Sequence, residues 1–464
     1  MNRSHRFNPT LLREYDVRGV VGQTLSAEDA RALGRAFGTR VARSGGRRVA
    51  VGRDGRLSSP EMEEAVVDGL KRCGLSIHRT GMGPTPMLYF AVRHLGLDAG
   101  VMVTGSHNPA QYNGFKLMLG KGTLHGADIQ ALGTIAAAGD FASGAGSVAD
   151  VAVLDAYVDR LVSEVAGWRD LTVVWDSGNG ASGPIVSRLA ARLPGRHVLL
   201  NEEVDGRFPA HHPDPTVAEN LVQLQDAVAR EKADLGIGLD GDGDRIGVVD
   251  GRGRILWGDQ LMVVLAEPVL KNQPGATIIA DVKASQVLFD EIARMGGKPL
   301  MWRTGHSLIK AKMMETGAPL AGEMSGHIFF ADRWYGFDDA QYAAIRLLEI
   351  LARGDMSLAA LRDRLPEAVN TPELRFTCSE GRKFAVVDEI RARLEQAGAR
   401  MQTVDGVRVR TEDGWWLLRA SNTQDVLVAR CEAASNAGLD RLRAALVDQL
   451  SRSGLDATGL GGLH

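Results

Sequence analysis

Residues 47–81, "RRVAVGRDGRLSSPEMEEAVVDGLKRCGLSIHRTG", contain the pattern that decides the fold. A β-branched run ends at Asp54 and a second short apolar run begins near residue 76, so each predicts a strand. Four side chains between these runs recur at helical spacing: Met62, Val66, Leu70 and Cys73. Ser59 is suited to cap this helix and Gly74 to end it. The stretch therefore predicts a strand, a helix and a second strand.

The same pattern occurs twice more, at residues 171–203 and 276–306. In these stretches, apolar runs ending at Asp176 and Asp281 lead into helical segments and then into a further strand. Three successive units of this kind predict α/β domains with a parallel sheet in each. In such sheets, ligand-binding groups gather in the loops that follow the strands.

The pattern changes after about residue 365. Pro366 and Pro372 flank a polar stretch that could act as a hinge, and short strands mixed with two amphipathic helices follow. A smaller α+β domain is expected there. We therefore expect an α/β protein of three consecutive α/β domains with similar topology, followed by this α+β domain, around a central cleft. The expected boundaries are residues 1–150, 151–253, 254–366 and 367–464.

The composition is that of a globular protein without a strong charge bias. Of the 464 residues, 44% are hydrophobic and 24% are charged, and the formal net charge is −3. Nothing in this balance points to nucleic acid or to an anionic membrane surface as a partner. Cys73, Cys378 and Cys431 lack the spacing of a zinc site or a disulfide framework. With no export signal or membrane span recognisable, we expect a cytoplasmic protein.

The densest chemical signal is "GIGLDGDGDRIGVVD" at residues 236–250, where aspartates alternate with glycines: Asp240, Asp242 and Asp244. Three carboxylates this close repel one another, so a bound hard cation is expected, and Mg²⁺ is our prediction. A calcium EF-hand is excluded because Arg245 and Gly251 stand where that loop needs glycine and glutamate. A solvated acidic turn is the other interpretation.

Phosphate chemistry around Mg²⁺ would need donors elsewhere in the chain. "LLRASNTQ" at residues 417–424 brings several together after a strand: Arg419, Ser421, Asn422 and Thr423. A forked guanidinium and neutral donors suit a phosphate dianion. Clusters of this kind are also common in ordinary turns.

"TGSHNP" at residues 104–109 puts Ser106 in a tight loop at the end of a strand. Such a loop suits a nucleophile or a carried phosphate, although a structural turn would have the same composition. A serine hydrolase is disfavoured because the chain has no G-x-S-x-G motif, the nearest stretch being "GASGP" at 180–184.

A dinucleotide-binding unit is an alternative from another class. "GNGASG" at residues 178–183 follows a strand, matches G-x-G-x-x-G, and has Glu202 and Glu203 about twenty residues further on. These features would fit an NAD(P)-dependent dehydrogenase. That hypothesis leaves the aspartate, serine and arginine loops unexplained.

Taken together and in this order, "TGSHNP", "DGDGDR", "GEMSGH" (322–327) and "RASNTQ" resemble the four signature loops of the α-D-phosphohexomutase superfamily. "REYDVRG" at 13–19 and "RTGHSLIK" at 303–310 add to a resemblance that spans nearly the whole chain. It looks most like the bacterial phosphomannomutase/phosphoglucomutase branch. The resemblance implies an isomerase that interconverts hexose 1-phosphate and hexose 6-phosphate, of mannose, glucose or both.

The resemblance also implies roles for particular residues. Ser106 would be stored as phosphoserine, held with Mg²⁺ by the three aspartates, and hexose 1,6-bisphosphate would be the intermediate and the activator. Four cations or donors would surround the transferring group: Arg18, His107, Lys116 and Arg245. Lys116, His327 or His306 would be the general base. The other substrate contacts would be Tyr15, Lys283, His306, Glu323 and Ser325, with Arg419, Ser421, Asn422 and Thr423 as the phosphate loop.

Some alternatives stay open on the sequence. A phosphoglucosamine mutase or a sugar-phosphate binder without turnover would share these motifs, and the choice between mannose and glucose depends on contacts that a sequence does not display. Asp425 stands where the family commonly has proline, which puts the rigidity of the last loop in doubt. We expect small hexose phosphates as partners, neither nucleic acid nor membrane, and a monomer or small homo-oligomer.

Overall fold

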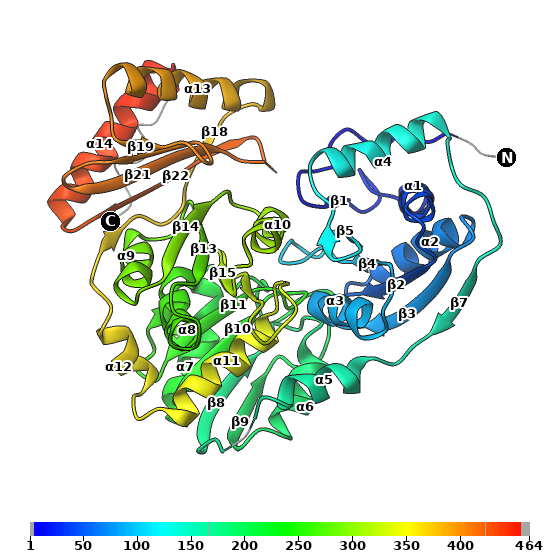
Figure 1. The fold of residues 1–464 in the computed structure, drawn as a ribbon, viewed down its shortest axis with the longest axis horizontal. Helices are drawn as coiled ribbons and strands as arrows, with labels where there is room; N and C mark the ends of the chain where they lie inside the picture. Colours follow the sequence, from blue (N-terminus) through cyan, green and yellow to red (C-terminus); the bar gives the residue numbers. More distant parts are fainter. Residues whose placement is uncertain (1–3, 166, 423, 456–464) are drawn as a thin grey trace.

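A computed structural model describes residues 4–165, 167–422 and 424–455. Four β-sheets follow one another along the chain, and we call the parts of the chain around them the first, second, third and C-terminal units. In Figure 1 the first unit lies on the right and the C-terminal unit at the upper left, with the second and third units between and below them.

The first unit contains a seven-stranded sheet of order β1-β5-β4-β2-β3-β7, with β6 paired to β5. Its elements are β1 (Val17–Val20), α1 (Ala27–Arg43), β2 (Arg48–Arg53), α2 (Ser59–Lys71), β3 (Ser76–Met82), α3 (Thr85–His94), β4 (Ala99–Val103), β5 (Tyr112–Leu119), β6 (Gly122–Thr123), α4 (Ala127–Ala138) and β7 (Ser147–Asp150). The predicted strand–helix–strand pattern is confirmed here, because β2 and β3 are parallel and α2 connects them.

The predicted cap of α2 is wrong. Ser58 is the N-cap residue, and Ser59 is already helical. The Ser59 hydroxyl instead donates to Oδ1 of Asp54 at 2.5 Å, so the tertiary contact with the end of β2 takes the side chain that could have capped the helix. The helix also ends at Lys71, three residues before Gly74.

The second and third units repeat the parallel pattern. The second contains α5 (Leu154–Val162), β8 (Leu171–Asp176), α6 (Gly183–Ala190), β9 (Gly195–Leu200), η1 (Ala218–Leu221), α7 (Val222–Glu231), β10 (Leu235–Leu239), β11 (Ile246–Asp250) and β12 (Ile255–Leu256). The third contains α8 (Gly258–Asn272), β13 (Thr277–Asp281), α9 (Gln286–Arg294), β14 (Lys298–Trp302), α10 (His306–Thr316), β15 (Leu320–Gly322), β16 (Ile328–Phe330), α11 (Ala340–Arg353) and α12 (Leu358–Asp363). Their sheets have the orders β12-β11-β10-β8-β9 and β14-β13-β15-β16.

The parallel sheets predicted for the first three units are mixed sheets. Central pairs such as β8 with β9 and β13 with β14 are parallel, but β4 with β5, β10 with β11 and β15 with β16 are antiparallel. Each of these units therefore contains a hairpin of two antiparallel strands. A short loop is enough to join antiparallel neighbours, whereas a parallel pair needs a crossover connection. The second sheet extends beyond the expected boundary at residue 253, because β12 pairs with β11.

The C-terminal unit is α+β, as predicted. It contains β17 (Val369–Asn370), β18 (Leu374–Thr377), α13 (Glu380–Gln396), β19 (Met401–Gln402), β20 (Val407–Arg410), β21 (Gly414–Ala420), β22 (Val426–Ala433) and α14 (Asn436–Arg452). The strand order is β17-β22-β21-β20-β19, all antiparallel, with β18 also paired to β22. Figure 1 shows α13 and α14 together on the same side of this sheet.

Each of the four signature stretches is the loop of a hairpin. "TGSHNP" lies between β4 and β5, and "DGDGDR" lies between β10 and β11. "GEMSGH" begins with the last residue of β15 and leads to β16, and "RASNTQ" begins with the last two residues of β21 and leads toward β22. Antiparallel pairing on both sides holds the ends of each loop close together. The hairpins are thus the device that presents these side chains.

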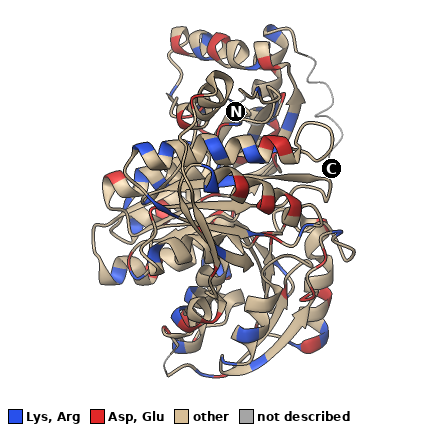
Figure 2. Cartoon of the chain, turned by 90° about the vertical axis from the view of Figure 1, so that its right-hand side faces the viewer, with Lys and Arg blue, Asp and Glu red and all other residues tan. Residues whose placement is uncertain are grey.

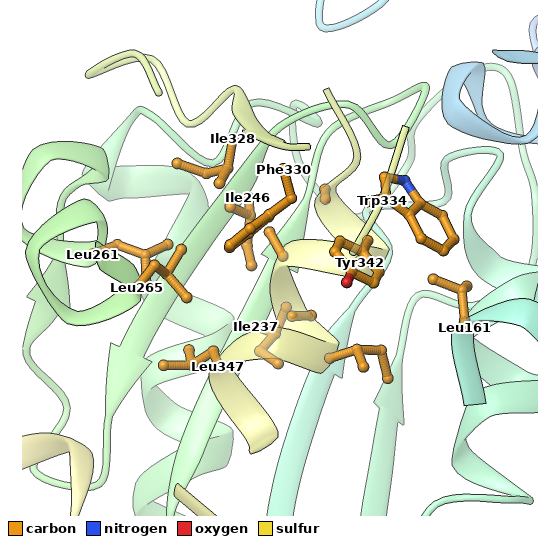
Figure 3. Close-up of a cluster of buried hydrophobic side chains, with 14 of the residues drawn as sticks. Leu161, Ile237, Ile246, Leu261, Leu265, Ile328, Phe330, Trp334, Tyr342 and Leu347 are labelled. Atoms are coloured by element: carbon orange, nitrogen blue, oxygen red, sulfur yellow. The ribbon is translucent and has the colours of Figure 1, made fainter. Parts of the chain in front are cut away.

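The first three units share part of their hydrophobic core, and the first unit also has a separate cluster of its own. One cluster joins α3 of the first unit, α5 and the second sheet, and α8 and α11 of the third unit; Figure 3 shows the part around Tyr342 and Phe330. The C-terminal unit has a core of its own and meets the third unit in a small cluster of Val282, Trp415 and Leu417. Burial thus binds the first three units together more extensively than it binds the fourth.

Charged residues are mixed over the molecule. In Figure 2, Lys and Arg alternate with Asp and Glu along the helices that face the viewer. Among the described residues, no helix has both the length and the apolar character that crossing a bilayer would require.

Candidate active site

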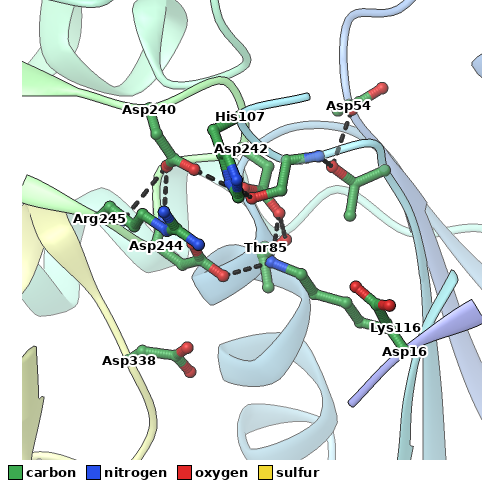
Figure 4. Close-up of polar contacts among 12 residues, drawn as sticks. Asp16, Asp54, Thr85, His107, Lys116, Asp240, Asp242, Asp244, Arg245 and Asp338 are labelled. Carbon is green, nitrogen blue, oxygen red and sulfur yellow. Dashed lines mark hydrogen bonds and ion pairs between the residues drawn. The ribbon is translucent and has the colours of Figure 1, made fainter. Parts of the chain in front are cut away.

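Three of the hairpin loops touch one another where the first three units meet. Figure 4 shows His107 of the first loop beside the aspartates and Arg245 of the second. Ser106 of the first loop contacts Asp240 of the second, and Arg245 of the second contacts His327 of the third. The fourth loop joins them through Asn422, which donates to the phenolic oxygen of Tyr15 at 2.5 Å. Residues predicted from four separate stretches are thus brought together.

The main chain and the hydroxyl of Ser106 are both constrained. Its φ is 50°, in the left-handed region that is uncommon for residues other than glycine. Its side-chain oxygen donates to Oδ2 of Asp240 at 3.1 Å and lies 3.2 Å from Nδ1 of His107. Burial lowers the pKa of His107 well below its ordinary value, and the nearby Arg245 lowers it further. The imidazole beside Ser106 is therefore neutral at neutral pH.

A buried ion pair supports the Ser106 loop from below. Arg56, fully buried, donates to the main-chain carbonyls of four loop and strand residues: Ser106 (2.6 Å), Asn108 (2.5 Å), Pro109 (2.6 Å) and Tyr112 (3.1 Å). Asp54 accepts from Arg56 at 3.2 Å and from the hydroxyl of Thr104 at 2.8 Å. The main chain on both sides of Ser106 is thereby held in place.

The three aspartates form one buried cluster. One carboxylate oxygen from each aspartate lies within 4.8 Å of those of the other two, and all three side chains are inaccessible to solvent. Nζ of Lys116 donates to Oδ2 of Asp242 at 2.7 Å and to Oδ2 of Asp244, and the Thr85 hydroxyl donates to Asp242 at 2.5 Å. Oδ1 of Asp242 and Oδ1 of Asp244 have no hydrogen-bond partner. Unpartnered buried carboxylate oxygens are ready ligands for a cation.

The cluster carries an electrostatic imbalance. Burial raises the pKa of Asp240 well above its ordinary value, and the neighbouring carboxylates add to the rise. Burial alone would lower the pKa of Lys116, but Asp242 and Asp244 outweigh it and raise that pKa well above its ordinary value. Lys116 is therefore an ammonium that partly neutralises a site with room for more positive charge, and the acidic cluster could bind a metal ion.

A second polar network surrounds His327. Its Nε2 accepts from Nε of Arg245 at 3.0 Å, and its Nδ1 lies 3.1 Å from Oδ2 of Asp338. Lys310 donates to the other oxygen of Asp338 at 2.8 Å and lies 3.1 Å from Nδ1 of His306. Burial lowers the pKa of His306 well below its ordinary value, and Lys310 lowers it further.

The "GEMSGH" loop contains two of the expected substrate contacts, Glu323 and Ser325, and the first of them makes a hydrogen bond within the third unit. Glu323 is buried and accepts from the amide of Gly305 at 2.5 Å. Burial raises the pKa of Glu323. Ser325 lies in the same turn and makes no hydrogen bond to another described residue. Lys283 pairs with Glu373 of the C-terminal unit at 3.0 Å.

The C-terminal loop is held near the third unit. Nε of Arg419 donates to Oδ2 of Asp405 at 2.9 Å, and Oγ of Ser421 accepts from the amide of Gln424 at 3.2 Å. Thr423 lies outside the described residues. The Asp425 side chain is exposed to solvent, and its carbonyl accepts from the amide of Cys378 at 3.0 Å.

Arg18 lies at the edge of the site. Its Nη1 donates to the side chain of Asn108 at 3.1 Å, and its Nη2 pairs with Asp16. Arg18 therefore contacts the Ser106 loop at Asn108. Among the described residues, no hydrogen bond joins Arg18 to Ser106 itself.

The glycine-rich stretch at 178–183 is packed from both sides. A Cβ at Gly183 would lie 1.9 Å from the carbonyl oxygen of Glu202, and one at Gly180 would lie 2.9 Å from that of Gly241. The protein's own main chain thus approaches where the dinucleotide hypothesis would bring in a pyrophosphate. The geometry disfavours a dehydrogenase.

Several residues of the site were not singled out from the sequence. They are Asp54, Arg56, Thr85, Thr104, Lys310, Asp338 and Asp405. Lys310 ends the "RTGHSLIK" stretch and Asp54 ends a predicted strand, so position alone could have marked these two. Thr104 begins the "TGSHNP" stretch and accepts from the Ser106 amide at 2.8 Å, so the motif itself could have marked it. Arg56, Thr85, Asp338 and Asp405 lie outside the quoted motifs and contact the site mainly through residues far away in the sequence.

Comparisons with known proteins cover the whole chain. Four domain descriptions match in order: Phosphoglucomutase/phosphomannomutase alpha/beta/alpha domain I at 9–143, domain II at 155–253, domain III at 257–369, and the C-terminal domain at 373–449. A phosphomannomutase/phosphoglucomutase of Pseudomonas aeruginosa is 47% identical over 441 residues, 95% of each chain. A phosphoglucomutase of Neisseria gonorrhoeae is 45% identical over 437 residues, 93% of this chain and 95% of the relative.

The solved structures agree with the sequence relatives. The crystal structure of a phosphoglucomutase/phosphomannomutase family protein from Burkholderia thailandensis has a TM-score of 0.92 to this chain at 45% identity. The match covers 97% of this chain and 99% of that one.

Proposed function

Since this chain belongs to the phosphoglucomutase/phosphomannomutase family and is an isomerase of phosphorylated hexoses, we propose that it interconverts the 1-phosphates and 6-phosphates of mannose and glucose through a phosphoserine at Ser106. The observation that carries this proposal is the contact between the Ser106 hydroxyl and Asp240. It sets a nucleophile directly beside the carboxylate cluster.

Ser106 would alternate between a free hydroxyl and a phosphate ester. In the forward step the bond between Oγ of Ser106 and phosphorus breaks, and a hydroxyl oxygen of the bound hexose monophosphate takes the phosphoryl group. The hexose 1,6-bisphosphate so formed would reverse its orientation in the site and return its other phosphate to Ser106. A trace of this bisphosphate would also serve as activator, because it can phosphorylate any enzyme that has lost its phosphate.

The aspartate cluster would hold Mg²⁺ together with the phosphoserine. The residues fit this ion, since they offer oxygen ligands and, within the described part of the chain, Oδ1 of Asp242 and Oδ1 of Asp244 accept no hydrogen bond. When bound, Mg²⁺ would neutralise charge on the transferring phosphoryl group. Lys116 and Arg245 supply further positive charge at the same place, and such charge stabilises the loose transition state of phosphoryl transfer.

A proton must leave the attacking hydroxyl. Two carboxylates hold Lys116 as an ammonium, which leaves the imidazoles as acceptors. Of these we assign the role to His327, which lies 3.1 Å from Asp338 and 3.6 Å from Asp244. A carboxylate beside an imidazole stabilises the cation that forms when it takes a proton.

The distal phosphate and the sugar would be bound by the remaining predicted residues. Glu323 and Ser325 would bind sugar hydroxyls, and Arg419, Ser421 and Asn422 would bind whichever phosphate is not reacting. Tyr15, Lys283 and His306 border these groups, because Tyr15 contacts Asn422 and its ring lies 6.2 Å from that of His306. Lys283 is held close to the C-terminal unit by Glu373.

Phosphorus NMR tests the proposal. The purified protein receives Mg²⁺, a trace of glucose 1,6-bisphosphate, and either mannose 1-phosphate or glucose 1-phosphate. We expect the 6-phosphate resonance to appear in both tubes, and the ratio of the two rates gives the sugar preference. A parallel tube with glucosamine 1-phosphate separates a phosphoglucosamine mutase. If no 6-phosphate forms in any tube, the chain binds sugar phosphates without isomerising them.

The remaining expectations about partners belong to the same proposal. We infer that the partners are small hexose phosphates and that the reaction takes place in the cytoplasm, where the free cysteines Cys73, Cys378 and Cys431 would stay reduced. Size-exclusion chromatography with light scattering distinguishes a monomer from a small homo-oligomer.

A further inference from the structure

Among the contacts between the C-terminal unit and the rest of the protein, those at the main chain of Thr304 in the third unit lead to the phosphate loop. The Thr304 amide donates to Oδ2 of Asp405 in the C-terminal unit at 3.0 Å. The Thr304 carbonyl accepts from the hydroxyl of Tyr15 in the first unit at 2.7 Å. Tyr15 in turn accepts from Asn422, so three units meet at this residue.

Both tethers lead to the same phosphate loop. Asp405 accepts from Nε of Arg419 at 2.9 Å, using the oxygen that also accepts from Thr304. Asn422 lies three residues after Arg419 and reaches Thr304 through Tyr15. Arg419 and Asn422 are therefore linked to the main-chain amide and the main-chain carbonyl of the same residue, Thr304.

The turn that carries Asp405 is built for close approach to Arg419. Gly406 follows Asp405 with a φ of 80°, and a Cβ there would lie 2.7 Å from Cα of Arg419. Glycine at this position lets the turn lie directly on β21. Arg419 and Asp405 are both largely shielded from solvent, with side chains 6% and 12% exposed.

The way Arg419 is bound leaves it able to capture an anion. Among the described residues its hydrogen bond uses Nε alone, so Nη1 and Nη2 can form a forked contact with a phosphate. A long side chain held at Nε has already lost much of its rotamer freedom, which lowers the cost of binding. Asp405 thus orients the guanidinium without occupying its terminal groups.

We propose that Asp405 is a positioning residue that makes phosphate capture by Arg419 depend on the docking of the C-terminal unit against Thr304. This inference rests on the proposed function, in which Arg419 binds the phosphate that is not reacting. When the unit is docked, the Thr304 amide and Arg419 share one carboxylate oxygen and the fork is aimed. When the unit moves away, Asp405 loses the Thr304 amide, and the alignment of Arg419 relaxes together with the contact of Asn422 to Tyr15.

The kinetic consequence is specific. A phosphate that is not reacting is held in the ground state and in the transition state alike, so weaker holding raises KM and changes kcat little. A charge-assisted hydrogen bond is of the size that changes binding by about ten- to a hundredfold. For Asp405→Ala we expect KM for glucose 1-phosphate to rise at least about tenfold, with kcat within about threefold of the native value.

A double-mutant cycle tests whether Asp405 acts through Arg419. We expect Arg419→Ala to raise KM, and adding Asp405→Ala to that variant to change KM by less than about twofold. The proposal would be overturned if the changes in KM of the two single variants multiplied in the double variant. An unchanged KM in Asp405→Ala alone would overturn it as well. Asp405→Asn keeps an acceptor for one of the two donors, and we expect an intermediate KM; it also replaces the alanine variant if that one does not fold.

The matched control is Asp413→Ala. Asp413 also pairs with an arginine of the C-terminal unit, Arg441, but on the exposed surface. We expect its KM to stay within about twofold of the native value. Calorimetric titration of each variant with glucose 1-phosphate gives the same comparison without turnover. If the native protein binds this sugar phosphate but does not isomerise it, the mutase proposal fails while the Asp405 proposal is still decided by the affinities.

Discussion

Neighbouring residues hold both the hydroxyl and the main chain of Ser106. Asp240 and His107 contact the hydroxyl, and Arg56 binds the carbonyl. An oxygen held this way could attack phosphorus or leave it without rearrangement of the loop, which is the form that positioning takes in phosphoryl transfer.

At the residue scale, Ser106→Ala removes the proposed phosphate reservoir. We expect a folded protein whose mutase rate falls at least about a thousandfold, because no other hydroxyl replaces the nucleophile. The lost hydrogen bonds should change the free energy of unfolding by only about 1 kcal/mol. Phosphorus NMR gives the rate and thermal unfolding gives the stability. Full activity in this variant would rule out a phosphoserine at this position.

Asp242→Asn tests the cluster at the same scale. The amide keeps the shape of the side chain but removes one charge, so we expect the Mg²⁺ concentration for half-maximal rate to rise at least about tenfold, or activity to be lost. The rate is measured across a Mg²⁺ titration. Asp226→Asn, a change of the same kind at an exposed position of α7, is the control and should leave the titration unchanged. An identical titration for both variants would contradict the metal assignment.

At the scale of elements, a hairpin loop alone does not define the position of its tip. The "TGSHNP" loop is held by β4 and β5 at its ends and by Arg56 in its middle. Arg56 lies in the segment between β2 and α2. The loop is therefore held by a part of the first unit that does not belong to the hairpin. The "DGDGDR" loop is held in a similar way, through Thr85 at the start of α3.

Arg56→Lys tests this support. An ammonium keeps the charge but cannot reach all four carbonyls, so buried acceptors lose their donors. We expect the mutase rate to fall at least about tenfold and the free energy of unfolding to drop by about 2 kcal/mol. Hydrogen exchange at residues 104–112 should speed up. Arg53→Lys changes a neighbouring arginine that pairs with Glu63, and its exchange in this loop should match that of the native protein.

At the scale of the whole molecule, the four units are not equivalent. The first three share one hydrophobic cluster, whereas the C-terminal unit has its own. Polar contacts therefore carry much of the contact between the third and C-terminal units, among them Lys283 with Glu373 and Thr304 with Asp405. Such contacts can be broken and remade at lower cost than a shared core, which is what a bisphosphate that turns over would need.

The contact of Lys283 with Glu373 predicts a pH dependence at this scale. Lys283 lowers the pKa of Glu373 to about 2, from an ordinary value of 4.5. Because the folded pKa is the lower one, the carboxylate stabilises the folded protein fully above about pH 4.5, and this is lost as the pH falls toward 2. The difference is about 3 kcal/mol at most.

Thermal unfolding without metal, from pH 3 to pH 7, checks this expectation. The native protein should be more stable than Glu373→Gln near neutral pH, and the gap should shrink below about pH 4.5. A gap that stays constant down to pH 3 would contradict the assigned contribution of the ion pair.

The sequence by itself determined the fold class, the family and the local chemistry of the four loops. Strand and helix periodicities are local, and so are the glycines and aspartates that form the loops; the α/β class and the α+β C-terminal unit are therefore confirmed. The sheets predicted to be parallel are mixed, and the predicted Ser59 cap was wrong. A hairpin strand reads locally like any other strand, and the Ser59 hydroxyl is taken by Asp54. The roles of the site residues stay predictions.

Only the tertiary structure decided which side chains meet. Ser106 and Asp240 are 134 positions apart, Lys116 and Asp242 are 126 apart, and Tyr15 and Asn422 are 407 apart. The support from Arg56 and the link from Asp405 to Thr304 arise in the same way, from pairs with no local spacing. The physical reason is that hydrogen bonds and ion pairs act over a few ångströms in space, so they depend on how the units pack and not on distance along the chain.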